Sequence, residues 1–322
     1  MANNTEREEI LAFVAEKYYL EDHRQTEIAE MIGLTRSAVS RMLTEARDKG
    51  IVEIVVHHPF HYDHGLEEEL KRRLGLKHVS VVEFINQPNY DDLRKQLGKA
   101  GSRLLGNLIK PGFLIGVAWG TTVQATIEAF DSSPSVNTKV VQLVGVLGST
   151  RHSYSAQTLV ERLANKVNGE GIYLYTPFIV ENEKTAASLL EDPSVEEAIS
   201  IARKCDIALM GIGTTKPEYC SLYKGKHINR EELDIIRSAG AVGDVCALYY
   251  EIDGSSARVD FHNHRIGIPL NDLKKINTRL AVAGNREKAE AILGAIRGDY
   301  INALVTDNQT AIRVLELDQG LN

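Results

Sequence analysis

Hydrophobic positions within residues 5–50 recur every three or four residues, as they do along one face of a helix. The first apolar stripe runs from Ile10 to Tyr18, and two shorter helical patterns follow it, separated at Gly33. The run "IVEIVV" at 51–56 then has the character of a strand. The N-terminal part of the chain is therefore predicted to be a small helical domain that ends in a strand.

From residue 66 onward, apolar runs of strand length alternate with amphipathic stretches of helix length. Strands are predicted at 78–84, 114–119, 139–145, 171–175, 206–212, 247–252, 279–283 and 301–306. Helices are predicted at 66–76, 92–109, 121–130, 155–167, 183–204, 285–297 and 308–317. Buried strands that alternate with helices favour a mostly parallel sheet covered on both faces, so the predicted fold class is α/β.

A chain of 322 residues is longer than one typical domain. The segment "HHPFHYDHG" at 57–65 contains two breakers of regular structure, Pro59 and Gly65. We therefore predict a helical domain at 1–56, a linker at 57–65 and an α/β domain at 66–322.

The whole chain is acidic, with 37 Lys and Arg against 44 Asp and Glu and a net charge of −7. This balance argues against a polyanion-binding surface over the whole molecule, although it leaves room for a local basic face. The three cysteines have no CxxC spacing. No apolar run approaches the ~18 residues that a membrane span needs, and the first residues lack the apolar region of a signal peptide. These features favour a reduced, cytoplasmic protein with no membrane partner.

The strongest motif is "QTEIAEMIGLTRSAVSRMLTEARDKG" at 25–50. Gly33 permits the positive φ that a tight turn between two helices needs, and Thr35 can cap the second helix. Ala29 must be small because the second helix crosses close to it. The spacing of Ala29, Gly33 and Val39 resembles the helix-turn-helix of bacterial regulators, whose second helix enters the DNA major groove.

This resemblance implies which side chains face DNA. They are Thr35, Arg36, Ser37, Ser40 and Arg41 on the second helix, and Arg24, Gln25 and Thr26 near phosphates at the start of the preceding helix. Arg36 and Arg41 are the expected base readers, because Arg pairs bidentately with guanine. Residues 1–56 are acidic as a whole, with seven basic and eleven acidic side chains, but residues 33–50 carry a local excess of two positive charges. The alternative is a helical hairpin used only for protein assembly.

A second motif lies where the apolar run at 114–119 stops at Gly120 and a helix follows at once. The unpaired N–H groups and the dipole at a helix start favour an anion. Gly120 lets an anion approach the backbone, and Thr121 and Thr122 add hydroxyl donors. The junction therefore predicts a phosphate site, although similar junctions also serve only to turn and cap the chain.

Three other junctions carry residues suited to the same ligand. Gly211 and Gly213 follow one strand, Asp244 lies in a glycine-flanked bend before another, and Lys288 lies on the first turns of a helix after Gly284. Ligands of parallel α/β sheets collect beyond the carboxyl ends of the strands. Anion donors, a carboxylate and a lysine are therefore expected to converge, as a polyhydroxylated phosphate ester requires.

The order of these motifs resembles the SorC/DeoR-type family of bacterial sugar-responsive transcriptional regulators. The resemblance covers essentially the whole chain and includes "GVAWGTT", "VVQLVG", "DIALMGIGT", "GAVGDV" and "AGNREKAEAI". It implies a winged-helix-like DNA-binding domain followed by a Rossmann-like effector domain similar in fold to sugar-phosphate isomerases. It also implies a homo-oligomer, typically a tetramer, that binds double-stranded operator DNA. This oligomer would repress a sugar or polyol catabolic operon, and a phosphorylated sugar or polyol would control it as the effector.

The resemblance further implies an effector-binding set. Its members are Gly120, Thr121, Thr122, Ser155, Gln157, Gly211, Gly213, Asp244 and Lys288. In this set Asp244 would accept sugar hydroxyls, and Lys288 would neutralise a phosphate or hold a hydroxyl. The charge of Lys288 would also tend to hold Asp244 ionised. After "VVQL" some relatives have a basic residue where this chain has Val144. This difference implies either a singly phosphorylated ligand held without a covalent bond or a ligand that is oriented differently.

Several other patterns do not change this picture. His57, His58, His61, Asp63 and His64 could supply metal ligands, but the tract is interpreted as a solvated linker. "GIGTT" lacks the full GxGxxG pattern, so no dinucleotide cofactor is expected. Trp119 ends a buried strand, a position more typical of a core. The remaining alternative is an isomerase-like enzyme with an accessory helix-turn-helix, in which only Asp244 could be the general base.

Overall fold

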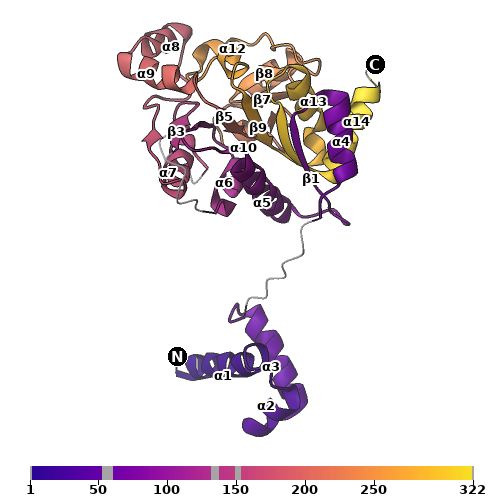
Figure 1. Cartoon of the computed structure of the whole chain (residues 1–322). Coiled ribbons are helices and arrows are strands. Elements are labelled where there is room, and N and C mark those ends of the chain that lie inside the picture. Colours follow the sequence, from indigo (N-terminus) through magenta and orange to yellow (C-terminus); the bar gives the residue numbers. More distant parts are fainter. Residues whose placement is uncertain (1, 53–60, 132–137, 149–153, 321–322) are drawn as a thin grey trace. The chain divides into compact units, whose positions relative to one another are not determined.

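The chain forms two compact units, Met1–Pro59 and Phe60–Asn322, in a computed structural model that describes residues 2–52, 61–131, 138–148 and 154–320 (Figure 1). The strand expected at 51–56 falls mostly outside the described residues, as do His57 and His58.

The N-terminal unit consists of three helices around its own core. They are α1 (Ala2–Tyr19), α2 (Gln25–Met31) and α3 (Arg36–Asp48). Gly33 has a φ of +68° in the turn between α2 and α3, and the Thr35 hydroxyl accepts a hydrogen bond from the Ala38 N–H at 3.3 Å. Ile28, Ala29 and Val39 are buried in this core, which confirms the expected helix-turn-helix.

The second unit is built on a parallel sheet that has seven strands within the described residues, in the order β1-β10-β9-β5-β2-β3-β4. Its strands are β1 (His78–Val82), β2 (Leu114–Val117), β3 (Lys139–Gln142), β4 (Gly171–Ile172), β5 (Ile207–Met210), β9 (Thr278–Val282) and β10 (Ala303–Asp307). A smaller antiparallel sheet contains β6 (Gly213–Thr214), β7 (Gly243–Val245) and β8 (Leu248–Tyr250).

Helices cover both faces of the large sheet, as the alternating pattern predicts. One face packs against α5 (Tyr90–Leu108), α6 (Thr121–Ala129) and α7 (Ala156–Lys166). The helices that contribute to the opposite core are α4 (His64–Leu74), α9 (Pro193–Ala202), α10 (Ser221–Lys224), α11 (Arg230–Ser238), α12 (Leu270–Leu273), α13 (Ala289–Arg297) and α14 (Asn308–Gly320). The remaining helical elements are α8 (Glu183–Leu190) and the 3-10 turns η1 (Asp260–His264) and η2 (Arg286–Lys288).

Two expected elements differ from those observed. The single helix expected at 183–204 is two helices, because Pro193 cannot continue a helix and instead begins α9 after the capping residue Asp192. The strand expected at 247–252 is one arm of the β7–β8 hairpin rather than a member of the parallel sheet. The helix α11 was not predicted.

The larger unit also begins earlier than residue 66. Tyr62 forms an antiparallel bridge with Val82, and the Asp63 carboxylate caps α4 by accepting the Leu66 N–H at 2.9 Å. Residues 61–65 are therefore part of the α/β unit, because their backbone and side-chain hydrogen bonds are satisfied there. Among the described residues, no helix is both long and apolar enough to cross a membrane.

Candidate functional site

The first half of α3 presents one exposed polar face. Thr35, Arg36, Ser37, Ser40 and Arg41 are all exposed, whereas the opposite face of the helix is buried in the core of the unit. Arg36 has no side-chain partner within the described part of the chain, and Arg41 Nε only reaches the Ser37 carbonyl at 3.4 Å. Two guanidinium groups therefore remain available on this face for a polyanion.

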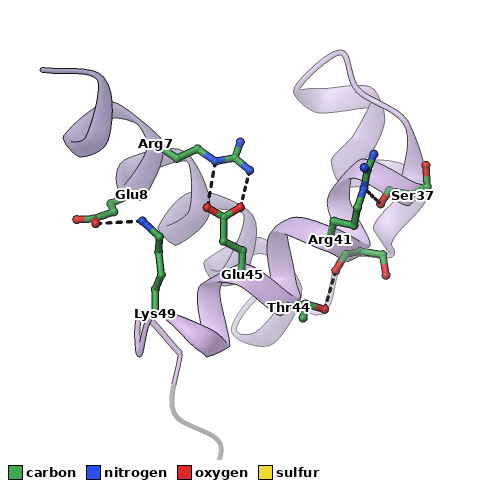
Figure 2. A network of polar contacts seen from close by, with 8 residues as sticks. Arg7, Glu8, Ser37, Arg41, Thr44, Glu45 and Lys49 are labelled. Carbon is green, nitrogen blue, oxygen red and sulfur yellow. Dashed lines mark hydrogen bonds and ion pairs between the residues drawn. The ribbon is translucent and has the colours of Figure 1, made fainter. Parts of the chain in front are cut away.

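Two charged residues in the second half of α3 and at its end, Glu45 and Lys49, pair with α1. Arg7 Nη2 and Glu45 Oε2 are 2.6 Å apart, and Lys49 Nζ is 3.4 Å from Glu8 Oε1. Figure 2 shows these pairs well away from Arg41 and Ser37 (Figure 2). Lys49 contributes one of the positive charges of residues 33–50, but this charge is paired with Glu8. The pairing of Glu45 with Arg7 also moves a negative charge off the polar face.

At the start of α2, Arg24 and Thr26 are exposed and Gln25 is half-buried. The Arg24 N–H donates to Glu27 Oε2 at 2.9 Å, and this bond lowers the pKa of Glu27. The three residues stay on the solvent side of the unit, where a phosphate could be contacted.

In the second unit a cavity of about 670 Å³ lies at the carboxyl ends of strands β2, β9 and β10 of the large sheet. It is lined by Trp119, Gly120 and Thr121 after β2, by Asn285, Arg286 and Lys288 after β9, and by Asp307 and Gln309 at the end of β10. A smaller cavity of about 40 Å³ shares Trp119, Gly120, Thr121, Ser221 and Lys288 and adds Gly211, Gly213 and Asp244 around β5 and β6. The strand ends therefore converge as expected for a ligand site of a parallel sheet.

Gly120 begins α6 with a φ of +146° and donates its N–H to the Tyr154 carbonyl at 3.1 Å. Thr121 lines both cavities. Thr122 is buried, and its hydroxyl donates to the Val282 carbonyl at 2.6 Å. The expectation that the Thr122 hydroxyl is a donor for the ligand is therefore wrong, because that proton holds α6 against β9. Its backbone N–H, at the helix start, is the group left for an anion.

Asp244 is a buried carboxylate that anchors the β7–β8 hairpin. Its Oδ2 accepts the Ala247 N–H at 3.0 Å, and the two turn residues, Cys246 and Ala247, have φ values of 52° and 54°. A Cβ atom at Gly213 would overlap Asp244 Oδ1. Gly213 is thus required by the carboxylate itself, and not only by a close approach of the ligand as expected.

Burial raises the pKa of Asp244 to about 6, against the lowering effects of the Ala247 N–H and of the charges of Lys288 and Arg265. Lys288 therefore does not hold the carboxylate as firmly ionised as expected. Lys288 Nζ donates to the Ile212 carbonyl at 2.8 Å, and burial lowers the pKa of the lysine. Asp244 of β7 and Lys288 of η2 both line the smaller cavity, so one ligand can contact both side chains.

The loop that carries Lys288 has an unusual backbone. Asn285 has a φ of 89°, which side chains rarely adopt, and its N–H donates to Asp307 Oδ2 at 3.0 Å. The same oxygen accepts the Thr310 hydroxyl at 2.6 Å. Asp307 thereby fixes a strained loop at the rim of the cavity, a placement typical of binding sites.

Other expected residues lie outside the cavities. Ser155 caps α7 by accepting the Thr158 N–H, and neither Ser155 nor Gln157 lines a described cavity. The neighbouring Tyr154 does line the larger cavity, and Val144 is fully buried in the core. Lining residues missed from the sequence include Tyr90, Tyr154, Lys224, Arg286, Asp307 and Gln309. Arg286 lies in the motif "AGNREKAEAI", and Asp307 and Gln309 lie in the run "VTDNQT". Tyr90, Tyr154 and Lys224 belong to no motif with a defined spacing.

The histidine-rich stretches have other partners. His64 Nδ1 is 2.8 Å from Glu67 Oε2, and His262 Nε2 accepts the Tyr249 N–H at 2.8 Å. Burial lowers the pKa of His262 to about 4, so it is a neutral acceptor. No group of three or more metal-ligating side chains occurs in the described ranges.

A helix-turn-helix unit with two exposed arginines on its second helix, joined to an α/β unit with a polar cavity, fits a DNA-binding protein that also binds a ligand. Residues 58–316 match the family described as "Putative sugar-binding domain", and residues 19–59 match the Crp-like helix-turn-helix domain. The chain belongs to the SorC/DeoR-type family of sugar-responsive transcriptional regulators.

Similar proteins cover the chain from end to end. The deoxyribonucleoside regulator of Bacillus subtilis is 31% identical over 307 residues, which are 95% of this chain and 97% of that protein. The transcriptional regulator LsrR of Escherichia coli K12 is 30% identical over 96% of this chain and 95% of its own length. The full-length sorbitol operon regulator SorC of Klebsiella pneumoniae has a TM-score of 0.73 at 27% identity and covers 96% of this chain and 99% of that one. These relatives are named as regulators and not as enzymes, so the isomerase-like alternative is not supported.

Proposed function

We propose that the protein is a repressor of a sugar or polyol catabolic operon, and that a phosphorylated sugar bound without a covalent bond in the larger unit controls it. One observation carries this proposal: a helix start, a lysine and a buried carboxylate share the cavities at the sheet edge. An anion suits the helix start and Lys288, and hydroxyl groups suit Asp244.

In the proposed complex the phosphate accepts the N–H groups of Thr121 and Thr122 and the Thr121 hydroxyl, with Lys288 as counter-charge. Gly120 and Gly211 leave the backbone open to the ligand. Ser155 and Gln157 would act only indirectly, by setting the position of Tyr154. Since Val144 is apolar and buried, no amine lies there to attack a sugar carbonyl.

On the DNA side, Arg36 and Arg41 read base edges, while Thr35, Ser37 and Ser40 and the start of α2 contact the backbone of the duplex. Half-sites one helical turn or a multiple apart would bind paired units of a cytoplasmic tetramer. Replacing Arg36 or Arg41 by alanine should weaken operator binding about tenfold or more, since a bidentate base contact contributes ~1–3 kcal/mol. An operator affinity unchanged in both variants would favour the protein-assembly alternative.

The effector is tested with a panel that contains glucose 6-phosphate, fructose 6-phosphate, ribose 5-phosphate, 2-deoxyribose 5-phosphate and sorbitol 6-phosphate. Trp119 lines both cavities and is the one tryptophan of the sequence, so its fluorescence reports binding. A true effector should raise the melting temperature by mass action. It should also weaken operator binding, and the operator should weaken effector binding by the same factor, because the coupling between the two sites is reciprocal.

Two variants separate the site from general effects. Lys288→Met should abolish the fluorescence response to the effector, whereas Lys275→Met, which removes an exposed lysine paired with Asp272, should leave it unchanged. The unphosphorylated sugars serve as the ligand control. If operator affinity is the same with and without every sugar phosphate, the sensing model is wrong, and product detected by NMR would restore the enzyme alternative.

A further inference from the structure

The residues that enter the α/β unit from the N-terminal side are hydrogen-bonded to the edge strand of the sheet. Within 61–63, the Asp63 N–H donates to the Val81 carbonyl at 2.9 Å, and the His61 carbonyl accepts the Glu83 N–H at 2.9 Å. Tyr62 therefore forms an antiparallel bridge with Val82 of β1, and we call residues 61–63 the entry strand.

The entry strand is also held by its central side chain. Tyr62 packs against the same core as Phe84, and the Arg103 guanidinium lies 5.7 Å from the centre of its ring. The chain that comes from the DNA-binding unit is thus fixed to the sheet at a defined point, and not at a free loop.

The segment that follows β1 runs from the entry strand to the ligand cavity. Its first residue, Glu83, bonds the entry strand, while Gln87, Pro88 and Tyr90 line the larger cavity. Fewer than ten residues therefore separate a hydrogen bond of the entry strand from the cavity wall.

Asn308 holds this segment at its second residue, Phe84. Its Nδ2 donates to the Phe84 carbonyl at 3.2 Å, and its Oδ1 accepts the Phe84 N–H at 3.3 Å. Its neighbours on either side, Asp307 and Gln309, both line the cavity. Asp307 in turn holds the N–H of Asn285 in the loop of Lys288.

We propose that Asn308 is a positioning residue that couples occupancy of the cavity to the entry strand, and through it to the DNA-binding unit. A ligand that moves the Lys288 loop shifts Asp307 and Asn308, and Asn308 then moves Phe84 and the Glu83–His61 hydrogen bond. Regulation by a phosphorylated ligand rests on the proposed function, but the mechanical link between Asn308 and the entry strand does not.

The link is tested first on the full chain without ligand, by hydrogen exchange of peptides that contain the amides of Asp63 and Glu83. Asn308→Ala should speed exchange at both amides about tenfold, because the clamp on Phe84 is lost. Asn308→Ser is a milder variant that keeps a hydroxyl near the start of α14 but is too short to bond both groups of Phe84. The matched control is Asn263→Ala, which removes only an exposed contact with Asp260.

A second measurement adds inorganic phosphate, with chloride at equal ionic strength as reference. In the unmodified protein, phosphate that changes Trp119 fluorescence should also slow hydrogen exchange at the amides of Asp63 and Glu83. In Asn308→Ser, phosphate should still change the fluorescence but should no longer slow the exchange at these two amides. Unchanged exchange in both Asn308 variants, or phosphate binding with no effect at the two amides, overturns the coupling. Absence of any Trp119 response counts against the proposed phosphate site, and the ligand-free comparison then decides the coupling alone.

Discussion

Asp244 and Gly213 show how a single buried charge constrains its surroundings. The carboxylate is paired across two short strands with Gly213, and it holds a two-residue turn in which both residues have positive φ. Non-glycine residues in this conformation are strained. The hydrogen bond from Ala247 offsets that strain, so the carboxylate maintains the hairpin as well as facing the cavity.

Gly213→Ala is expected to destabilise the protein by about 1–3 kcal/mol, because the added methyl overlaps the Asp244 carboxylate in a packed interior. Gly211→Ala is the matched control, since its methyl would lie 3.5 Å from the Thr122 hydroxyl in ordinary contact. Urea denaturation of both variants gives the comparison. If both variants lose the same unfolding free energy, the Asp244 carboxylate is not the reason that glycine is needed at position 213.

The raised pKa of Asp244 has a definite sign in the stability curve. An exposed aspartate titrates near 3.9, whereas burial brings Asp244 to about 6. Between those pH values the native carboxyl keeps a proton that the unfolded chain has released, so its contribution to the unfolding free energy falls as pH rises and is fully lost above 6.

Asp244→Asn should remove that contribution. The unfolding free energy of the unmodified protein minus that of the variant should therefore decrease from pH 4 to pH 7, by up to about 3 kcal/mol. Denaturation at four pH values in this window measures it. A difference that is flat or that rises with pH contradicts the assignment of a buried, proton-holding carboxyl.

At the scale of elements, the close approach of α5 and α6 shapes the cavity. Tyr90 and Leu93 of α5 and Thr121 of α6 all line it. A Cβ atom at Gly98 would lie 2.6 Å from the backbone carbon of Ala125, so the two helices meet at a distance that only glycine allows there. Helix packing and the position of the phosphate junction are therefore linked.

Substitutions in one helix can test this link. Gly98→Ala should lose about 1–2 kcal/mol and weaken ligand binding, because α5 must move away from α6. Gly106→Ala lies on an exposed position of the same helix with its nearest contact at 3.7 Å, and it should gain up to about 1 kcal/mol from helix propensity. Thermal denaturation and the Trp119 titration report the two effects. A Gly98 variant as stable as the Gly106 variant would refute the packing argument.

The elements that could be predicted are those with a strong repeat. The apolar strands of the parallel sheet and the helices between them follow from burial on both faces, as at Ile207–Met210. The β7–β8 hairpin could not be predicted, because its strands have three residues each and its turn uses Cys246 and Ala247 in place of the usual Asn or Gly. Pro193 itself marks the break between α8 and α9, because proline cannot continue a helix.

At the scale of the whole molecule, site residues could be predicted where glycine and hydroxyl residues mark a strand end, as at Gly120. Tyr154 and Asp307 could not be assigned a role, because their contribution depends on tertiary placement and not on spacing. The same limit applies to Thr122, whose hydroxyl is bound to Val282, a partner 160 residues away in the chain. Local pattern therefore located residues that line a cavity, and long-range hydrogen bonds decide which of their atoms remain available.

Every residue that lines the two cavities belongs to Phe60–Asn322, which has its own cores. The chain reduced to 60–322 should therefore fold and should lose all operator binding. In the absence of DNA, its affinity for the effector, measured by Trp119 fluorescence, should lie within about threefold of the full-length affinity. A tenfold loss of effector affinity would mean that the N-terminal unit contributes to the effector site. The operator could then change effector binding directly, without a structural change passed through the entry strand.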